Sequence, residues 1–324
     1  MRAVRVHELT GPKGLRVDEI DSPSPGEGEV QISVRAAGVN FPDVLLTYGK
    51  YQFKPEPPFV PGAEAAGVVS AVGPGVGGLK VGDRVVTSMV NGAFAEQVVV
   101  PEQTAVKLPD AVDFTTGAVT LLTYATTYHA LVDRAQLKAG ETLLVLGAAG
   151  GVGVAAIQLG KLLGARVIAA ASSAEKIAFC RQMGADEGIN YGAEDLKERV
   201  KSLTGGDGAN VVYDPVGGAY SEAALRAIAW QGRFLVVGFA AGDIPKIPLN
   251  LVLLKGCQVV GVFWGSFSMR EAAKNRANCD QVLQWIAAGR LKPHLDATLP
   301  FARAAEALER LERRAVQGKI ALVP

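Results

Sequence analysis

The stretch LLVLGAAGGVGVAAIQLGKLLGARVIAA, residues 143–170, decides the fold. An apolar run at 143–148 leads into a glycine-rich turn, an apolar helical segment follows at once, and a second apolar run ends the stretch. Glycine lets the backbone approach a pyrophosphate, and a helix N-terminus offers its N–H groups to phosphate oxygens. The order strand, glycine turn, helix and strand therefore predicts a dinucleotide-binding unit.

The glycine pattern itself departs from G-x-G-x-x-G, because Ala148 stands at the first position and Gly150 and Gly153 at the second and third. Both flanking elements nevertheless fit the motif. We expect Gly150, Gly151 and Val152 to contact the coenzyme. The alternative interpretation is a glycine-rich turn that only tightens the packing of helix on strand.

The 143–148 run is the first of six near-continuous apolar runs. The other five lie at 166–171, 187–191, 210–216, 233–239 and 257–264. Longer segments of mixed polarity separate them, a pattern typical of strands that are buried on both faces and alternate with helices. The sequence predicts an α/β fold with a doubly wound parallel Rossmann sheet, in a domain spanning 122–264.

The N-terminal third contains shorter β runs separated by Gly and Pro, at 2–7, 15–20, 29–36, 65–72, 83–87 and 94–100. Closely spaced short strands indicate a mostly antiparallel, barrel-like unit. Two helical stretches, 271–288 and 301–316, precede a last apolar run, KIALVP. We expect this run to return to the N-terminal unit, making a discontinuous domain of 1–121 and 265–324. The alternative is a third, small subdomain.

Composition narrows the class of protein. The chain has 324 residues, with 33 Lys and Arg against 32 Asp and Glu, so it lacks the basic excess expected of a nucleic-acid or membrane-surface binder. Its 3 Cys are an odd number without C-x-x-C spacing, which argues against disulfides and thiolate metal sites. No signal peptide or membrane-spanning run is apparent. We expect a cytoplasmic globular protein.

The end of the second strand of the Rossmann sheet bears on the choice of coenzyme. An acid there would accept the ribose hydroxyl of NAD and repel the 2′-phosphate of NADP. The chain reads AAASS at 169–173, without an acid before Glu175. Ser172 and Lys176 offer a phosphate pocket that Tyr191 can close, so the pattern favours NADPH. In the alternative interpretation, Lys176 is only a solvated helix residue.

Several motifs together resemble one family over nearly the whole chain. They are RAAGVNFPD (35–43), VPGAEAAGVVSAVGPGV (60–76), VGDRV (81–85), GAAGGVGVAAIQLGKLLGA (147–165), MGADEGINY (183–191), VVYDPVG (211–217), GRFLVVGF (232–239) and GKIALVP (318–324). The chain resembles the medium-chain dehydrogenase/reductase superfamily, and within it the zinc-free NADPH quinone oxidoreductases of the zeta-crystallin type. This resemblance implies a GroES-like catalytic domain beside the Rossmann domain.

The zinc alcohol dehydrogenases of that superfamily carry a cysteine after Gly-Val and a later Gly-His-Glu. The corresponding positions here read Gly38-Val39-Asn40 and Gly62-Ala63-Glu64. An amide is a poor zinc ligand and alanine is none, so we expect no metal. Without a Lewis acid, alcohol oxidation loses its usual driver, whereas hydride transfer to an electrophilic acceptor needs no metal.

The resemblance also implies roles for individual residues. Asn40 and Asp43 would line the site beside the nicotinamide, Asn40 as a donor to the acceptor oxygen and Asp43 as an orienting group. Tyr51 falls at the position of a pocket tyrosine. The alternative for Asn40 and Asp43 is that both satisfy backbone groups in a turn-rich segment.

Further coenzyme contacts follow from the same resemblance and from the ends of the strands. They are Thr123, Val216, Gly238, Phe239, Phe263 and Lys319. For Lys319 the sequence leaves two readings open, a coenzyme contact and an ordinary surface lysine.

Three functions remain in competition at this level. The leading one is an NADPH-dependent quinone reductase. The second is an NADPH-dependent enoyl reductase acting on enones or short enoyl-CoA esters, with Tyr48 and Tyr51 as candidate proton donors. The third is a non-catalytic NADPH-binding or RNA-associated protein. The apolar edge run at 257–264 also predicts a homodimer, in line with the resemblance.

Overall fold

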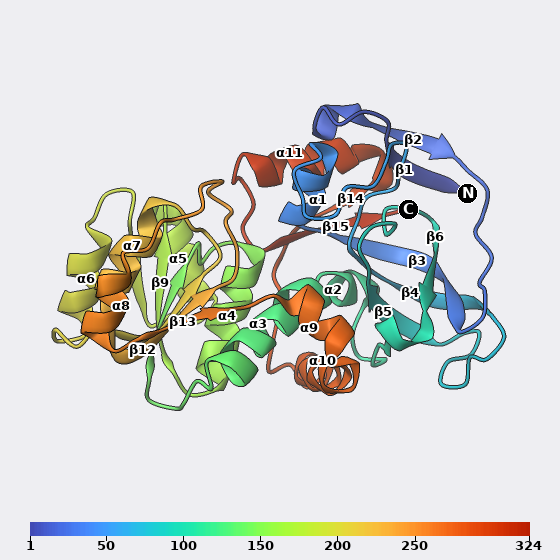
Figure 1. Cartoon of the computed structure of the whole chain (residues 1–324). Coiled ribbons are helices and arrows are strands. Elements are labelled where there is room, and N and C mark those ends of the chain that lie inside the picture. Colours follow the sequence, from blue (N-terminus) through green and yellow to red (C-terminus); the bar gives the residue numbers. More distant parts are fainter. The chain divides into compact units, whose positions relative to one another are not determined.

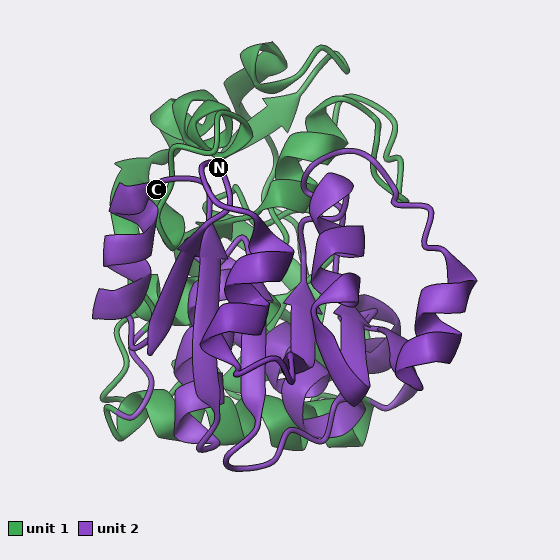
Figure 2. Cartoon of the chain, turned by 90° about the vertical axis from the view of Figure 1, so that its left-hand side faces the viewer, with its two compact units in different colours: residues 1–122, 272–289, 293–324 green, residues 123–271, 290–292 purple.

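The computed structural model describes residues 1–324, and the chain divides into two compact units (Figures 1 and 2). The first unit comprises residues 1–122, 272–289 and 293–324, and the second comprises 123–271 and 290–292. The sequence-based division placed the second boundary at 264/265, earlier than the one between Glu271 and Ala272. The assignment of a catalytic and a coenzyme-binding role to separate domains stays a prediction.

The second unit is built on a six-stranded sheet in the order β10-β9-β8-β11-β12-β13, in which all neighbouring strands are parallel. The strands are β8 (Thr142–Leu146), β9 (Arg166–Ala171), β10 (Glu187–Asn190), β11 (Ala209–Asp214), β12 (Ile228–Val236) and β13 (Gln258–Gly261). This is the strand order of the Rossmann fold. The α/β fold class predicted from the sequence is confirmed.

Helical segments connect these strands (Figure 1). They are α4 (Gly151–Leu162), α5 (Ala174–Gln182), α6 (Leu196–Leu203), α7 (Ala219–Arg226), α8 (Leu249–Lys255) and α9 (Trp264–Arg270). A continuous helical stretch precedes β8, formed by η3 (Leu121–Ala125), α3 (Thr126–Tyr128) and η4 (His129–Arg134), of which η3 and η4 have π-helical geometry. No helix of the chain combines the length and apolar character needed to span a membrane.

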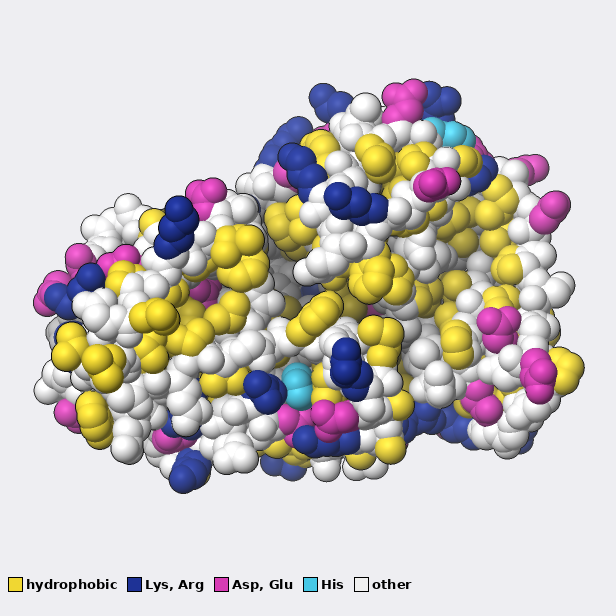
Figure 3. Space-filling model, viewed as in Figure 1, with side chains coloured by type: hydrophobic (Ala, Val, Ile, Leu, Met, Phe, Trp, Pro, Cys, Tyr) yellow, Lys and Arg dark blue, Asp and Glu magenta, His cyan; other side chains and the backbone are white.

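The apolar runs of the sequence become strands because the middle of this sheet is covered on both faces. The four residues Leu143 to Leu146 on β8 are fully buried, which explains why apolar residues follow one another there without alternation. The edge strand β13 differs, since it is largely exposed and Val259 keeps 45% of its surface. Figure 3 shows hydrophobic side chains gathered over α8, where Leu249, Leu253 and Leu254 are exposed.

The first unit contains a sheet in the order β14-β15-β3-β4-β5-β7, with β6 also paired to β3. Its strands are β3 (Glu29–Val39), β4 (Glu64–Val72), β5 (Arg84–Ser88), β6 (Gln97–Pro101), β7 (Ala105–Lys107), β14 (Leu295–Pro300) and β15 (Lys319–Val323), and a separate pair is formed by β1 (Arg2–Val6) and β2 (Leu15–Glu19). All pairings are antiparallel except that of β14 with β15. This arrangement is the mostly antiparallel, GroES-like unit of the predicted fold.

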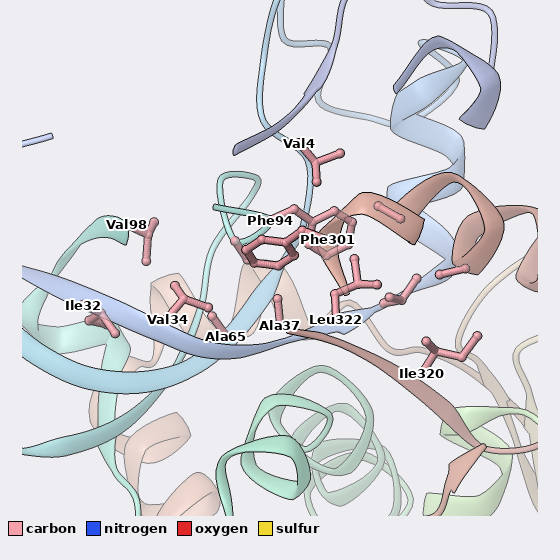
Figure 4. Close-up of a cluster of buried hydrophobic side chains, with 14 of the residues drawn as sticks. Val4, Ile32, Val34, Ala37, Ala65, Phe94, Val98, Phe301, Ile320 and Leu322 are labelled. Atoms are coloured by element: carbon pink, nitrogen blue, oxygen red, sulfur yellow. The ribbon is translucent and has the colours of Figure 1, made fainter. Parts of the chain in front are cut away.

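The last strand carries the C-terminal segment into this sheet. In the antiparallel pairing of β15 with β3, Ile320 faces Val39 and Leu322 faces Ala37. Ile320 and Leu322 are fully buried in one core cluster with Phe94 and Phe301, which Figure 4 shows converging from different strands and turns. The helical segments of this unit are η1 (Pro12–Gly14), α1 (Phe41–Thr47), η2 (Glu102–Thr104), α2 (Phe114–Ala118), α10 (Ala272–Ala287), η5 (Phe301–Arg303) and α11 (Ala304–Glu312).

The structure corrects the predicted last strand of the Rossmann sheet. The run 257–264 is apolar except for Gln258, but only Gln258–Gly261 forms β13, and α9 begins at Trp264. The N–H of Val262 still donates to the carbonyl of Val236 at 2.9 Å. The chain then leaves the sheet and enters α9. The Trp264 side chain at the start of this helix is buried, whereas Phe263 before it is 53% exposed. Apolarity here reflects packing of the α9 start as well as the sheet.

Candidate functional site

In the glycine turn after β8, the backbone of α4 passes very close to the backbone of the turn. A Cβ atom on Gly153 would lie 2.5 Å from the carbonyl oxygen of Gly147 and 2.6 Å from the backbone of Ala148, so only glycine fits where α4 crosses the turn. Gly150 caps α4, and a Cβ there would meet nothing nearer than 3.5 Å. Packing within the protein therefore does not demand a glycine at 150, whereas a ligand approaching the backbone would.

The start of α4 provides the donors of this candidate coenzyme site. Gly151 and Val152 occupy the first turn of this helix of 12 residues. The first N–H groups of an α-helix have no intrahelical acceptor and lie at its positive end. Gly151 and Val152 thus offer N–H groups at an anion-binding N-terminus, consistent with a diphosphate ligand, whereas the N–H of Gly150 donates to the carbonyl of Gly147 at 3.1 Å.

The residues expected to choose between NADPH and NADH share one edge of the sheet. The Lys176 ammonium lies 3.5 Å from the Ser172 hydroxyl, and Ser173 caps α5 by accepting from the N–H of Lys176 at 3.2 Å. The N–H of Tyr191 donates to the carbonyl of Ala171. Ser172, Lys176 and Tyr191 therefore meet at the carboxyl ends of β9 and β10, where no acid ends the second strand.

Tyr220, on α7, is a neighbour of this group that the sequence did not single out. Its ring lies 4.1 Å, centroid to centroid, from the ring of Tyr191. A tyrosine in a helical segment is uninformative alone, since only the sheet order brings the α7 start to the end of β10. The pair adds an aromatic surface beside the predicted phosphate pocket.

Asp214 is a second residue that the sequence did not single out, and its hydrogen bonds fix the backbone of the loop after β11. Its buried carboxylate accepts from the N–H of Val216 at 2.8 Å, from the N–H of Gly217 at 2.9 Å and from the Ser221 hydroxyl at 2.5 Å. The N–H of Val216 is consequently engaged within the protein. The signal available in the sequence was an acid directly after an apolar strand, in NVVYDPV.

Val216 instead presents its side chain to the glycine turn. A Cβ on Gly147 would lie 2.7 Å from Cγ2 of Val216, so the two carboxyl-end loops are in contact. Gly238 and Phe239 follow β12 in the next loop, and Phe239 is 39% exposed. Ligands of doubly wound sheets bind at these carboxyl ends.

The two remaining predicted contacts of the second unit are Thr123 and Phe263. Thr123 is buried in η3, where its carbonyl accepts from the Thr127 hydroxyl at 2.8 Å. Phe263 is the exposed residue before α9. The Thr127 hydroxyl also lies 3.5 Å from the carbonyl of Val152, so Thr123 and the start of α4 share a hydrogen-bonding neighbour.

In the first unit, Asn40, Asp43, Glu64 and Lys319 form a buried set that we call the polar cluster, and each is at most 5% exposed. The Lys319 ammonium donates to Glu64 Oε1 at 3.0 Å, to the carbonyl of Val39 at 2.7 Å and to Asn40 Oδ1. Lys319 is therefore not a surface lysine, and that reading of the sequence is wrong. Its ammonium is fully engaged inside the first unit.

Asn40 is likewise saturated. Its amide nitrogen donates to Glu64 Oε1 at 2.9 Å and to the carbonyl of Gly38 at 3.2 Å. The second oxygen of Glu64 accepts from the N–H of Leu122 at 3.0 Å. The role of Glu64 has no local signal in the sequence, because only the fold brings Lys319, far away in the chain, to its carboxylate.

Asp43 is the unusual member of the polar cluster. Its Oδ2 accepts from the N–H of Asn40 at 2.8 Å in a capping arrangement at the start of α1, as the turn-based interpretation expected. Its Oδ1 is buried without a hydrogen-bond partner. Burial, opposed in part by the N–H of Asn40, by Lys319 and by the nearby N–H of Gly62, raises the pKa of Asp43 to about 7.

Tyr51 is a neighbour of the α1 segment that carries Asp43, because it packs with Leu46, which follows Asp43 by about one helical turn. Its side chain is half-buried and packs against Val6, Leu46 and Phe59. Burial and the nearby Asp43 charge raise the pKa of Tyr51 above its usual value. Tyr48 is oriented differently, since its hydroxyl donates to Glu312 at 2.8 Å.

The polar cluster does not fit a zinc ion. Ala63 has no ligand atom, the Asn40 oxygen accepts from Lys319, and Glu64 is neutralised by the same ammonium. No group of three or more His, Cys, Asp or Glu in the chain is arranged to hold a metal ion. A cation introduced here would have to displace Lys319.

Comparison with known proteins identifies the family. Residues 26–110 match the alcohol dehydrogenase GroES-like domain, and residues 151–288 match the zinc-binding dehydrogenase family. The chain is 39% identical to a quinone oxidoreductase-like protein 2 homolog of Nematostella vectensis, over 99% of this chain and 88% of that protein. It is an oxidoreductase of the medium-chain dehydrogenase/reductase superfamily and belongs to the quinone oxidoreductase family, as the sequence motifs predicted.

Two similar solved structures carry different functional descriptions. The Escherichia coli quinone oxidoreductase complexed with NADPH is 33% identical, with a TM-score of 0.94 and complete coverage of both chains. A protein described as an NAD-dependent alcohol dehydrogenase is 34% identical, with a TM-score of 0.92 and complete coverage of both chains. Because one fold accommodates both descriptions, the coenzyme and the reaction of this chain must be argued from its own residues.

The raised pKa of Asp43 predicts how stability depends on pH. The folded chain binds this proton more tightly than the unfolded chain, whose Asp pKa is near 3.8, so this carboxyl makes the free energy of unfolding fall as pH rises from about 4 to about 7, by at most about 1.4 kcal/mol per unit. Asp43→Asn removes this dependence. Denaturant titrations at pH 5 and pH 8 should show the variant gaining on the wild type at pH 8.

The matched control is Asp110→Asn, in the same unit, because the Asp110 side chain is fully exposed. Its difference from the wild type should be the same at both pH values. A constant difference for Asp43→Asn as well would mean that Asp43 titrates like an ordinary surface acid.

Proposed function

We propose that this oxidoreductase transfers a hydride from NADPH to a quinone without zinc. The observation that carries the proposal is the composition of the polar cluster. At the positions of the zinc ligands of related alcohol dehydrogenases stand Asn40 and Ala63, and Glu64 pairs with the Lys319 ammonium at 3.0 Å. Alcohol oxidation in that superfamily depends on a Lewis acid, whereas a quinone already accepts electrons readily.

The proposed coenzyme site lies along the carboxyl ends of the sheet in the second unit. Gly150, Gly151 and Val152 would hold the diphosphate, and Ser172, Lys176 and Tyr191 the 2′-phosphate. Val216, Gly238 and Phe239 would line the nicotinamide side, to which we also assign Thr123 and Phe263. NADPH supplies the hydride when bound, and these residues bind and orient it. Support comes from the exposed Ser172, the absent acid and the NADPH complex of the Escherichia coli relative.

Asn40, Asp43 and Tyr51 are the proposed residues at the acceptor. The amide of Asn40 is engaged by Glu64 and Gly38, which argues against its acting as the direct donor to the acceptor oxygen. Lys319, with its three donors used, would act on the coenzyme or acceptor only through its field. Tyr51, half-buried and protonated at neutral pH, is the group of this set best able to contact a small molecule.

A screen of electron acceptors tests the proposed reaction. Stopped-flow traces of NADPH oxidation with simple quinones, enones and short enoyl-CoA esters should show turnover with quinones, and no loss of rate after treatment with a chelator. Activity on enones or enoyl-CoA esters alone would move the assignment to the enoyl reductase, which requires a proton at the α-carbon. Inactivity with every acceptor would favour a non-catalytic NADPH-binding protein.

The preference for NADPH has its own test at Lys176. Replacing Lys176 by Ala removes one charge-assisted contact to the 2′-phosphate, so kcat/KM for NADPH should fall roughly 10-fold while that for NADH stays unchanged. Lys197→Ala is the control, since Lys197 pairs with Glu198 on α6. A wild-type preference for NADH, or equal losses for both coenzymes, would contradict the phosphate role of Lys176.

We also propose a homodimer that pairs two copies along β13. Support comes from its position at the edge of the sheet and from the exposed Val259. A lysine blunts such an edge, so light scattering should find a dimer for the wild type and a monomer for Val259→Lys. Val81→Lys, at a 59% exposed valine of the other unit, should stay dimeric. A monomeric wild type at micromolar concentration would contradict the proposal.

A further inference from the structure

Asp43 holds the one oxygen of the polar cluster that has no hydrogen-bond partner. Its side chain is fully buried, and Oδ1 is the unpartnered atom. Buried polar atoms are nearly always paired, so an exception calls for an explanation. Every other side-chain N or O atom of the cluster is engaged within it, by its neighbouring backbone or by Leu122.

The charges of the polar cluster explain why this carboxyl group is best accommodated with a proton. The cluster holds two carboxyl groups, of Asp43 and Glu64, and one ammonium, of Lys319. The three donors of that ammonium go to Glu64, Asn40 and the carbonyl of Val39, so none remains for Asp43. A buried carboxylate without a cationic partner is costly, and a proton removes the cost.

The titratable groups facing Asp43 are Glu64, Lys319 and Tyr51, as the electrostatic contributions to its pKa and to that of Tyr51 indicate. Glu64 favours the protonated form of Asp43 and Lys319 opposes it, while burial has the largest effect and brings the pKa to about 7. Tyr51 is the only one of the three that is half-buried rather than buried. It is therefore the neighbour through which a proton can leave.

We propose that Asp43 stores the proton that accompanies the hydride and delivers it through the Tyr51 hydroxyl to the acceptor. This inference rests on the proposed function, which supplies the hydride. The acceptor gains the hydride with its two electrons, and the Tyr51 O–H bond breaks to give the acceptor a proton. The O–H bond of Asp43 breaks in turn and restores the Tyr51 hydroxyl. Water then returns a proton to the Asp43 carboxylate, so one hydride and one proton are consumed per turnover.

The unpartnered Oδ1 is the atom that suits this role. It is free to form one new hydrogen bond, to the Tyr51 hydroxyl or to a water molecule beside it, without breaking an existing one. Asp43 acts through Tyr51 and is a positioning residue and proton store, while Tyr51 is the group that touches the acceptor. A purely structural Asp43 would need only Oδ2, which caps the start of α1.

The test is the pH dependence of kcat, with saturating NADPH and a quinone, from pH 5.5 to 9. The wild type should lose activity as pH rises through about 7, because the Asp43 carboxyl group loses its proton above its pKa. Asp43→Asn should lower kcat about 10- to 100-fold and abolish that decline. The control Asp110→Asn should retain both the rate and the decline. NADPH affinity, measured by fluorescence titration, should be the same in all three proteins.

The Tyr51→Phe variant tests whether Asp43 and Tyr51 act in one proton-transfer route or affect kcat independently. If the proton passes from Asp43 through Tyr51, the single variants should lose similar factors in kcat, and the double variant should lose no more than either one. A double variant whose losses multiply would overturn the relay.

The remaining outcomes also decide the matter. Asp43→Asn with unchanged kcat and an unchanged decline would overturn the inference while leaving the quinone reductase intact. A wild type without activity on any acceptor would instead count against the proposed function. Should Asp43→Asn fail to fold, the wild type suffices, since a kcat that is flat between pH 6 and 8, without a solvent deuterium isotope effect, overturns the proposal.

Discussion

The buried ion pair between Lys319 and Glu64 is the constraint on which the first unit depends. It joins the start of β15 to the start of β4 at 3.0 Å, although 255 positions separate the two residues. Loss of one partner of such a pair costs about 3–5 kcal/mol, because an uncompensated charge stays buried. Glu64 also accepts from the N–H of Leu122. One carboxylate thus ties together the C-terminal strand, the Asn40 segment and the beginning of η3.

The same ion pair determines what chemistry is left for the polar cluster. Because the ammonium of Lys319 neutralises Glu64 and orients the amide of Asn40, neither of these residues is available to a metal ion. Asp43 remains as a buried carboxyl group without a counter-charge, and its pKa rises to about 7. The cluster therefore combines the Lys319 ammonium with the Asp43 carboxyl group, which can hold a proton near neutral pH. This combination suits a reaction that consumes a proton at neutral pH.

The elements that could be predicted from the sequence are those that are buried most completely. The central strands were found because both faces of the sheet are covered, which forces continuous apolar runs such as Leu143 to Leu146. The short strands β7 and β14 were not found, since three residues or a half-exposed strand leave no periodic signal. The end of the run 257–264 was misassigned because a buried helix start and a strand are equally apolar.

The sequence by itself determined the fold class, the glycine turn with its helix, the absence of an acid after the second strand, and the absence of the usual zinc ligands. These are local properties, legible in spacing and residue type. Only the tertiary structure decided that Lys319 is buried, that Glu64 is its partner, that Asp214 shapes the loop after β11 and that Asp43 keeps an unpartnered oxygen. Each of these depends on burial and on contacts between segments far apart in the chain, and such contacts exist only once the sheets have formed.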